Sequence, residues 1–277
     1  MQRYKVAVCQ MTIHQEKEKN LVRAREMIAR AARQGARLVV LPEMFNCPYV
    51  ARLFPRYAES YPEGPSLQML SRAAREEGVY LVGGSLPERD GDQVYNTSFI
   101  FAPDGRLLGK HRKMHLFDVE LASGLTVKES STIGAGNQVT VIPSELGDLG
   151  VAICYDIRFP ELMRLMVLKG ARVVVIPAAF NMTTGPAHWE LVFRMRAIDN
   201  QAYFIGASPA RDPMAPYVAY GHSLVVDPWG NVVSMAREGE EIVYAEIDLD
   251  LIEKTRSELP LLRHRRTDIY ALELLAP

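Results

Sequence analysis

Residues 149–162 read LGVAICYDIRFPEL, a stretch that changes from strand to helix within a few positions. The apolar run over 149–154 predicts a buried strand, and the segment from Glu161 to Lys169, which Gly170 ends, predicts a helix. The turn between them carries Cys154, and in layout, though not in motif, it resembles a nucleophile elbow. This stretch predicts an α/β fold.

The same alternation continues on both sides of this stretch. Strands are predicted over 6–10, 38–41, 79–84, 172–179, 202–208 and 242–248, and helices over 20–34, 66–77 and 187–200. Two hairpins, which turn at 103–105 and at 227–230, make the sheets mixed rather than wholly parallel. We find no repeat of fixed period, no low-complexity tract and no linker, so residues 1–277 are predicted to form one domain.

Composition excludes several classes of function. The 277 residues include 32 Lys plus Arg and 33 Asp plus Glu, a net charge of -1 without the basic excess of a nucleic-acid-binding protein. Three cysteines without a Cys-x-x-Cys pair fit a reducing compartment. The N-terminus lacks the features of a signal peptide, and no apolar run approaches the ~20 residues of a membrane span. The sequence predicts a cytoplasmic protein that contacts neither nucleic acid nor membrane.

Three reactive side chains each follow an apolar strand. Glu43 follows RLVVLP, Lys113 follows RLLGKHR, and Cys154 follows LGVAI. Ligands bind beyond the carboxyl ends of strands in α/β folds, so this placement could bring the three together. A carboxylate could then take the thiol proton, a cation could hold the oxyanion, and sulfur could form an acyl intermediate.

Each of these residues also has an ordinary structural interpretation. Cys154 could be a small buried hydrophobe, Glu43 a solvated loop residue, and Lys113 part of a solvated charge run. A Cys–His pair is the other catalytic possibility, with His115, His188 or His222 as the base. These histidines rank lower because none of them sits at a strand end beside a second reactive group.

Several segments resemble the signature segments of the carbon–nitrogen hydrolase (nitrilase) superfamily. They are LVVLPEMFNCPY (38–49), GKHRKMHLF (109–117), GVAICYDIRFPEL (150–162) and AFNMTTGPAHWELVFRMRAIDNQ (179–201). The similarity covers essentially the whole chain, and FNMTTGPAHWE, ASPARD and GHS are most similar to the omega-amidase branch. The resemblance implies a four-layer αββα sandwich with two mixed sheets, which dimerises so that the sheets extend across the interface.

The resemblance also implies the catalytic residues. By motif these are Glu43 as base, Lys113 as oxyanion clamp, Cys154 as nucleophile, and Glu129 as a second glutamate that orients Lys113 and the attacking water. The backbone N–H of Tyr155 would be a further oxyanion donor. This chemistry uses no metal and no organic cofactor.

The omega-amidase branch implies small amides with a second carboxylate as substrates, such as 2-oxoglutaramate and 2-oxosuccinamate. A free carboxylate calls for a fork-shaped cationic donor, and Arg158 is the candidate, unless it forms a structural ion pair with Asp156 or Glu161. Phe180, Thr184 and Tyr49 would shape the rest of the pocket.

Two other functions stay open at this point. The nearest is a deaminated-glutathione amidase, or another aliphatic amidase or carbamylase, with the same catalytic residues and a different acyl pocket. The other is a non-catalytic binding protein that keeps the fold, in which case Cys154 would be an inert buried thiol.

Overall fold

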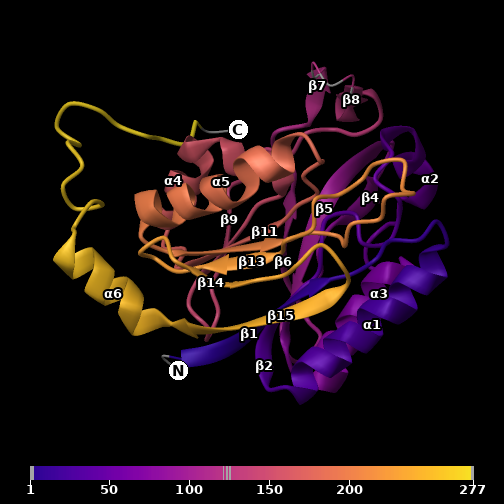
Figure 1. The fold of residues 1–277 in the computed structure, drawn as a ribbon, viewed down its shortest axis with the longest axis horizontal. Coiled ribbons are helices and arrows are strands. Elements are labelled where there is room, and N and C mark those ends of the chain that lie inside the picture. The colour runs from indigo at the N-terminus through magenta and orange to yellow at the C-terminus, as the bar shows by residue number, and fades with distance from the viewer. Residues whose placement is uncertain (1–2, 121, 123, 125, 276–277) are drawn as a thin grey trace.

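The chain is folded into four layers, two sheets packed face to face with helices on both outer faces (Figure 1). The computed structural model describes residues 3–120, 122, 124 and 126–275. Helices α1 (Lys17–Arg33) and α3 (Pro65–Glu77) cover the first sheet, and α4 (Pro160–Leu168) and α5 (Thr184–Asn200) cover the second. The predicted αββα sandwich is confirmed.

The first sheet has the strand order β15-β1-β2-β3-β5-β4, and β6 also pairs with β5. The β1–β2 and β2–β3 pairs are parallel and the other pairs are antiparallel, so the sheet is mixed as expected. Its strands are β1 (Arg3–Gln10), β2 (Ala36–Val40), β3 (Tyr80–Val82), β4 (Leu86–Asp90), β5 (Gln93–Phe101), β6 (Leu107–Arg112) and β15 (Glu241–Asp248).

The second sheet has the strand order β14-β13-β12-β11-β10-β9. Only the β10–β11 and β11–β12 pairs in it are parallel. Its strands are β9 (Thr140–Ile142), β10 (Leu149–Val151), β11 (Val173–Pro177), β12 (Tyr203–Ala207), β13 (Leu224–Val226) and β14 (Val232–Met235). The β10 strand ends three residues before Cys154, so the predicted strand over 149–154 was too long.

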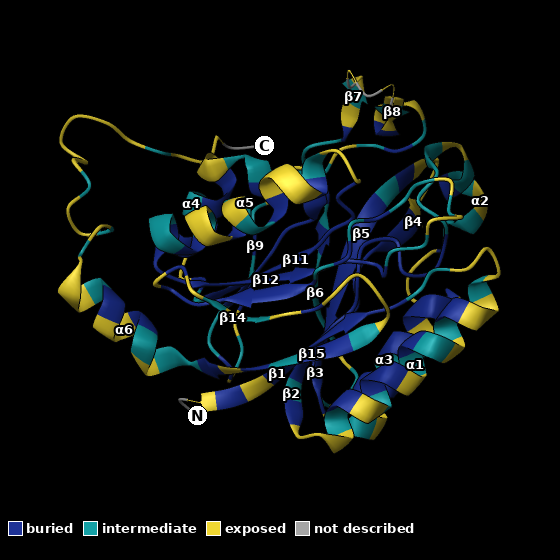
Figure 2. Cartoon of the chain, in the orientation of Figure 1, coloured by how far each residue is buried: buried dark blue, intermediate teal, exposed yellow. Residues whose placement is uncertain are grey.

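The core has three apolar layers because successive side chains of a strand point to opposite faces. In β2, Leu38 faces the second sheet and Val39 faces α1 and α3. In β11, Val173 faces the first sheet and Val174 faces α4 and α5. Both sheets are therefore buried on both faces, while the helices keep an exposed outer side (Figure 2).

A few elements were not predicted from the sequence. They include α2 (Phe54–Tyr57), the pair β7 (Asp118–Glu120) and β8 (Thr126–Lys128), and α6 (Leu249–Glu258), together with β4 and β9. Most are short, and short segments carry little periodicity. None of the helices in the described part of the chain is both long enough and apolar enough to span a membrane.

Gly84 lets the loop after β2 pass close to the end of β3. Its φ of +59° lies in the left-handed region, and a Cβ built there would stand 2.1 Å from the carbonyl oxygen of Pro42. The Gly83-Gly84 pair therefore has a steric role beside Glu43.

Replacing Gly84 with alanine should destabilise the protein through both backbone strain and this clash. Gly78→Ala is a matched control, because Gly78 has a φ of +63° but nothing lies within 4 Å of the point that a Cβ would occupy. We expect Gly78→Ala to cost about 1–2 kcal/mol and Gly84→Ala clearly more. Urea unfolding measures both, and equal losses would contradict the steric role.

Candidate active site

The candidate site lies where strand ends from both sheets meet. Glu43 follows β2 and Lys113 follows β6, both in the first sheet, whereas Cys154 follows β10 in the second. The β6 strand runs in the same direction as β2, since β3 is parallel to β2 and two antiparallel pairings follow it. The carboxyl ends of β2 and β6 therefore lie at one edge of the sheet.

Lys113 is the centre of this cluster. Its ammonium nitrogen Nζ lies 3.0 Å from Glu43 Oε1 and 2.9 Å from Glu129 Oε2, and all three side chains are buried. Burial alone would lower the pKa of Lys113, but the charges of Glu129 and Glu43 outweigh it and raise the pKa well above its ordinary value. Lys113 is therefore a permanent cation and cannot serve as the base.

Glu129 is held by neutral donors as well as by Lys113. The Tyr49 hydroxyl donates to Oε1 at 2.7 Å, and the backbone N–H of Phe117 donates to Oε2 at 2.7 Å. Tyr49 also lies 3.5 Å from Lys113 Nζ. These contacts leave Glu129 little freedom, so it fixes the position of the lysine.

Glu43 is the carboxylate nearest the thiol. Its Oε1 accepts from Lys113 and, at 2.9 Å, from Asn96 Nδ2, while Oε2 is without such a partner among the described residues. Burial raises the pKa of Glu43, although Lys113 opposes the shift. A raised pKa makes this carboxylate a stronger base, and the thiol of Cys154 is close enough to affect it.

Cys154 occupies a strained position in a tight turn. It begins the 3₁₀ helix Cys154–Arg158 with a φ of +47°, a left-handed conformation that is rare for residues with a Cβ. Burial and the Glu43 charge raise the pKa of its thiol, while Lys113 and the backbone N–H of Ala179 lower it. The cysteine therefore rests as a thiol and needs a base to become nucleophilic.

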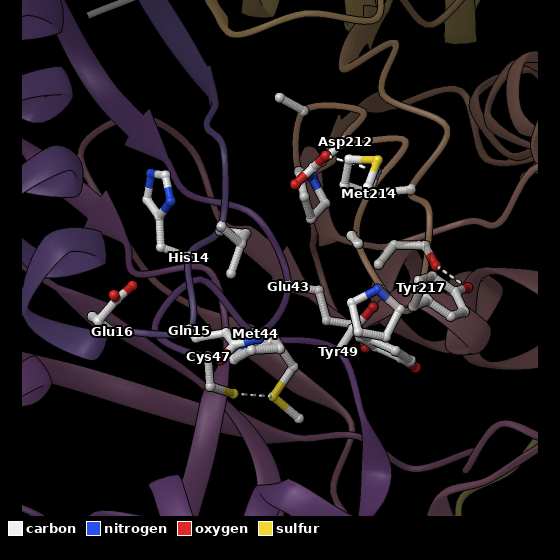
Figure 3. Close-up of a pocket in the computed structure, with 18 residues that line it drawn as sticks. His14, Gln15, Glu16, Glu43, Met44, Cys47, Tyr49, Asp212, Met214 and Tyr217 are labelled. Carbon is white, nitrogen blue, oxygen red and sulfur yellow. Dashed lines mark hydrogen bonds between the residues drawn. The ribbon is translucent and has the colours of Figure 1, made fainter.

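A cavity of about 300 Å³ leads from the surface to Glu43 (Figure 3). Tyr49 and Tyr217 form part of its wall, with ring centroids 4.6 Å apart, and the Tyr217 hydroxyl donates to the carbonyl of Ala179 at 2.6 Å. The outer residues come from the loop before α1 and the loop after β12. They are His14, Gln15, Glu16, Asp212 and Met214.

The structure brings together some of the predicted site residues and separates others. Glu43 and Tyr49 line this cavity, and Lys113, Glu129 and Cys154 are buried around Glu43. Arg158 instead borders a separate hollow on the outer side of α5.

Phe180, Thr184 and Tyr155 line neither the cavity beside Glu43 nor the hollow beside Arg158. The Arg158 guanidinium lies 4.6 Å from the ring centroid of Phe180, and Phe180 packs in the same apolar cluster as Cys154. Thr184, the first residue of α5, donates through its backbone to Asn181 Oδ1 at 2.8 Å. Tyr155 packs edge-on against Phe117, 5.1 Å between centroids. Neither of the ion pairs suggested for Arg158 is found among the described residues.

The alternative histidine bases are engaged elsewhere. His115 Nδ1 lies 2.8 Å from Asp156, His188 Nδ1 lies 3.1 Å from Arg158, and the His222 ring stacks on Tyr220. The geometry favours Glu43 as the base. No group of His, Cys, Asp or Glu side chains in the described ranges is arranged to hold a metal ion.

Two residues at the site were missed from the sequence. Asn96 is a fully buried amide in β5, but its neighbours Thr97 and Ser98 are polar and buried as well, so nothing in the sequence singles it out. Tyr217 lies in a loop without regular pattern, and only the folded chain places it against Tyr49.

With this geometry established, comparison with known proteins identifies the family. Residues 5–257 match the model of the carbon–nitrogen hydrolase family, and the chain belongs to that family. It is therefore a C–N hydrolase, as the sequence predicted.

Individual relatives are similar over their whole length. The chain is 49% identical to omega-amidase NIT2 of Danio rerio over 272 residues, 98% of each chain. It is 48% identical to omega-amidase NIT2 of Homo sapiens over 277 residues, 100% of each chain. The crystal structure of Saccharomyces cerevisiae Nit3, a member of branch 10 of the nitrilase superfamily, has a TM-score of 0.89 and 46% identity, covering 96% of this chain and 97% of that one.

Removing the buried cation should destabilise the fold in a pH-dependent way. In Lys113→Met, Glu43 and Glu129 lose their counter-charge, so the pKa of Glu43, which burial already raises, rises further above its value in the unfolded chain. Stability is then lost as pH rises through the folded-state pKa of Glu43. We expect a loss of about 3–5 kcal/mol at pH 8 and a smaller loss at pH 5, measured by urea unfolding.

Lys110→Met is the matched control, because Lys110 is partly exposed and pairs with Glu88, which keeps Arg112 as a second partner. Its cost should stay below about 1 kcal/mol. A loss in Lys113→Met that is equal at both pH values would contradict the charge-based explanation.

Proposed function

We propose that this chain is an omega-amidase, which hydrolyses monoamides of dicarboxylates such as 2-oxoglutaramate and 2-oxosuccinamate to the acid and ammonia. The observation that carries the proposal is the buried contact of Lys113 with Glu43 and Glu129 beside the thiol of Cys154. The similarity to omega-amidases over the whole chain supports the same substrate class.

The first half of the reaction forms a thioester. Glu43 takes the thiol proton as Cys154 sulfur attacks the amide carbonyl carbon, and the carbonyl oxygen becomes an oxyanion. Lys113 and the backbone N–H of Tyr155 stabilise that oxyanion, and one such donor contributes about 3 kcal/mol to lowering the barrier. The C–N bond then breaks, and protonated Glu43 gives its proton to the departing nitrogen, which leaves as ammonia.

The second half releases the acid. Glu43, now a carboxylate again, takes a proton from water, and the hydroxide oxygen attacks the thioester carbon. Glu129 holds Lys113 in place for this second oxyanion. The C–S bond breaks, Glu43 returns its proton to the sulfur, and the free enzyme is restored without a metal or organic cofactor.

We propose that Arg158 binds the remote carboxylate of the substrate, with Thr184 and Phe180 as further binding residues. Arg158 does not line the cavity beside Glu43 in this structure, so its side chain would have to leave His188 and turn toward Cys154. Its guanidinium lies over the Phe180 ring, and that ring shares an apolar cluster with Cys154. In the structure Arg158 donates to His188. On binding substrate, Arg158 would therefore exchange its bond to His188 for a bond to a carboxylate. A hydrogen bond to a charged acceptor is stronger than one to a neutral ring nitrogen.

Replacing the nucleophile tests the core of the proposal. Cys154→Ala should lower ammonia release from 2-oxoglutaramate by more than about 10⁴-fold. An acid-quenched reaction of the wild type should show an acyl adduct on Cys154 by mass spectrometry. Cys9→Ala is the control, since Cys9 is a fully buried thiol of β1 that packs in the cluster under α1 and takes no part in the proposed chemistry. Retained turnover in Cys154→Ala would sink the assignment.

Replacing Arg158 tests the substrate class. Arg158→Ala should raise KM for 2-oxoglutaramate by about 10–100-fold, the value of a charged hydrogen bond, and change KM for a simple aliphatic amide far less. Arg158→Lys keeps the charge but loses the fork of donors, so it should recover only part of the affinity. Equal effects on both substrates would rule out the carboxylate role.

A panel of substrates tests which length of acyl chain the enzyme accepts. Ammonia release across monoamides of C4 and C5 dicarboxylates, compared with hydrolysis of deaminated glutathione, separates an omega-amidase from the amidase with the longer pocket. The cavity volume of about 300 Å³ accommodates small amides of the first kind.

We also propose a cytoplasmic homodimer. The three cysteines are free thiols, which suits a reducing compartment. On the outer face of α5, Leu191 is 62% exposed and Met195 is 49% exposed. A second copy of the chain packed there would cover the hollow that Arg158 borders and leave the cavity beside Glu43 as the route for the substrate. Light scattering should give twice the monomer mass, and Leu191→Glu should reduce it to the monomer mass.

A further inference from the structure

Asp156, two residues after Cys154, is a fully buried carboxylate that no step of the proposed reaction uses. Its oxygens take part in four hydrogen bonds: Oδ2 accepts from Ile153 N and His111 Nε2, and Oδ1 accepts from the N and Nδ1 of His115. Burial would raise the pKa of Asp156, but the bonds from His111 and His115 outweigh it and lower the pKa. The group is therefore a permanent anion.

The two histidines flank Lys113 in the chain. His111 lies in β6 two residues before the lysine, and His115 follows it by two residues. Asp156 lies in the 3₁₀ helix that Cys154 begins. One carboxylate therefore joins both sides of the Lys113 segment, from the first sheet, to the Cys154 turn, from the second sheet.

Asp156 also supports the strained backbone of the nucleophile. Its side chain accepts from the N–H of Ile153 at 3.0 Å, and its own N–H donates to the carbonyl of Ile153 at 3.0 Å. These two bonds close the turn around Cys154, whose φ is +47°. A strained residue persists only where the surroundings hold it, and here Asp156 does so.

The bonds of the histidines are directional. Asp156 is ionised, so His111 donates from Nε2, and its Nδ1 is free to accept from the Thr140 hydroxyl at 3.0 Å. His115 donates from Nδ1 while its ring stacks on Phe159 at 3.6 Å between centroids. An apolar side chain could fill either place, but it would remove one of the two side-chain bonds that tie the Lys113 segment to Asp156; at position 115 the bond from the backbone N–H would remain.

We infer that Asp156, through His111 and His115, is a positioning residue that sets Lys113 Nζ relative to Cys154 Sγ for oxyanion binding. The inference rests on the proposed roles of Lys113 and Cys154. Asp156 itself touches neither substrate nor reacting atoms. Its effect should therefore fall on steps that form an oxyanion, and spare steps that need the thiol alone.

Three measurements separate an effect on oxyanion binding from an effect on the thiol alone. The first is ammonia release from 2-oxoglutaramate, which passes through an oxyanion. The second is alkylation of Cys154 by iodoacetamide, which displaces iodide and forms no oxyanion. The third is binding of 4-oxobutanoate, an aldehyde with a terminal carboxylate, measured as protection from alkylation. The thiol adds across its C=O bond, the S–C bond forms, and the thiol proton passes to the oxygen, which then occupies the oxyanion position without turnover.

In Asp156→Asn, the amide N–H₂ would face two of the four N–H groups that donate to Asp156. Two donors cannot bond to each other, so the contacts of residue 156 with the Lys113 segment or with Ile153 should break. We expect kcat to fall about 100-fold, as for a 1 Å misplacement, with KM within about threefold. Binding of 4-oxobutanoate should weaken at least tenfold, and alkylation at pH 8 should stay within about fivefold. An unchanged kcat and aldehyde affinity would overturn the inference, as would equal losses in all three measurements.

His115 offers a second pair of variants at a partly exposed position, should Asp156→Asn fail to fold. His115→Asn keeps a donor near Nδ1 and should retain kcat within about fivefold, while His115→Leu should lose roughly tenfold or more. Equal kcat values in the two variants would overturn the inference. His264→Leu, an exposed histidine near the C-terminus, is the control and should match the wild type.

The inference and the proposed function fail in different ways. A wild type that releases no ammonia from 2-oxoglutaramate overturns the proposed substrate, while the aldehyde and alkylation measurements still decide the role of Asp156. The wild type could instead show full turnover while Asp156→Asn and His115→Leu both leave aldehyde binding unchanged. That result overturns only the positioning role.

Discussion

Lys113 carries a positive charge on a fully buried side chain, and this ammonium group constrains the structure around it. An uncompensated buried charge costs several kcal/mol, so the fold must bring carboxylates to it. Glu43 supplies one from the end of β2, and Glu129 supplies another from the segment after β8. Glu129 in turn needs the Tyr49 hydroxyl and the Phe117 N–H. The position of each group at the site is thus fixed by the hydrogen bonds or the counter-charge that its neighbour needs.

The same arrangement separates the chemical properties of the three proposed catalytic groups. Two carboxylates raise the pKa of Lys113 and keep it a cation, while burial raises the pKa values of Glu43 and Cys154. The lysine can therefore only stabilise negative charge, and Glu43 is the group able to take up and release protons. In the proposed mechanism Glu43 and Lys113 divide between them the tasks of base and cation, for which a cysteine nucleophile more often uses a histidine.

Much of the fold could be predicted from the sequence, because long amphipathic helices and β-branched strands carry strong periodicity. The helix over 66–77 and the strand over 242–248 are close to α3 and β15. Segments of three residues such as β9 escaped prediction, as their pairing depends on partners distant in the chain. Asn96 escaped for a related reason: its importance lies in a hydrogen bond to Glu43, 53 residues away.

The sequence by itself pointed to the family, to most of the order of strands and helices, and to the proposed catalytic residues, because motif and hydrophobic pattern are local properties. Only the tertiary structure decided which side chains share a site. It placed Glu129 against Lys113, turned Asp156 toward His111 and His115, and left Arg158 over the Phe180 ring, outside the cavity that Glu43 lines. Those distances depend on how two sheets pack, and the packing is a property of the whole chain.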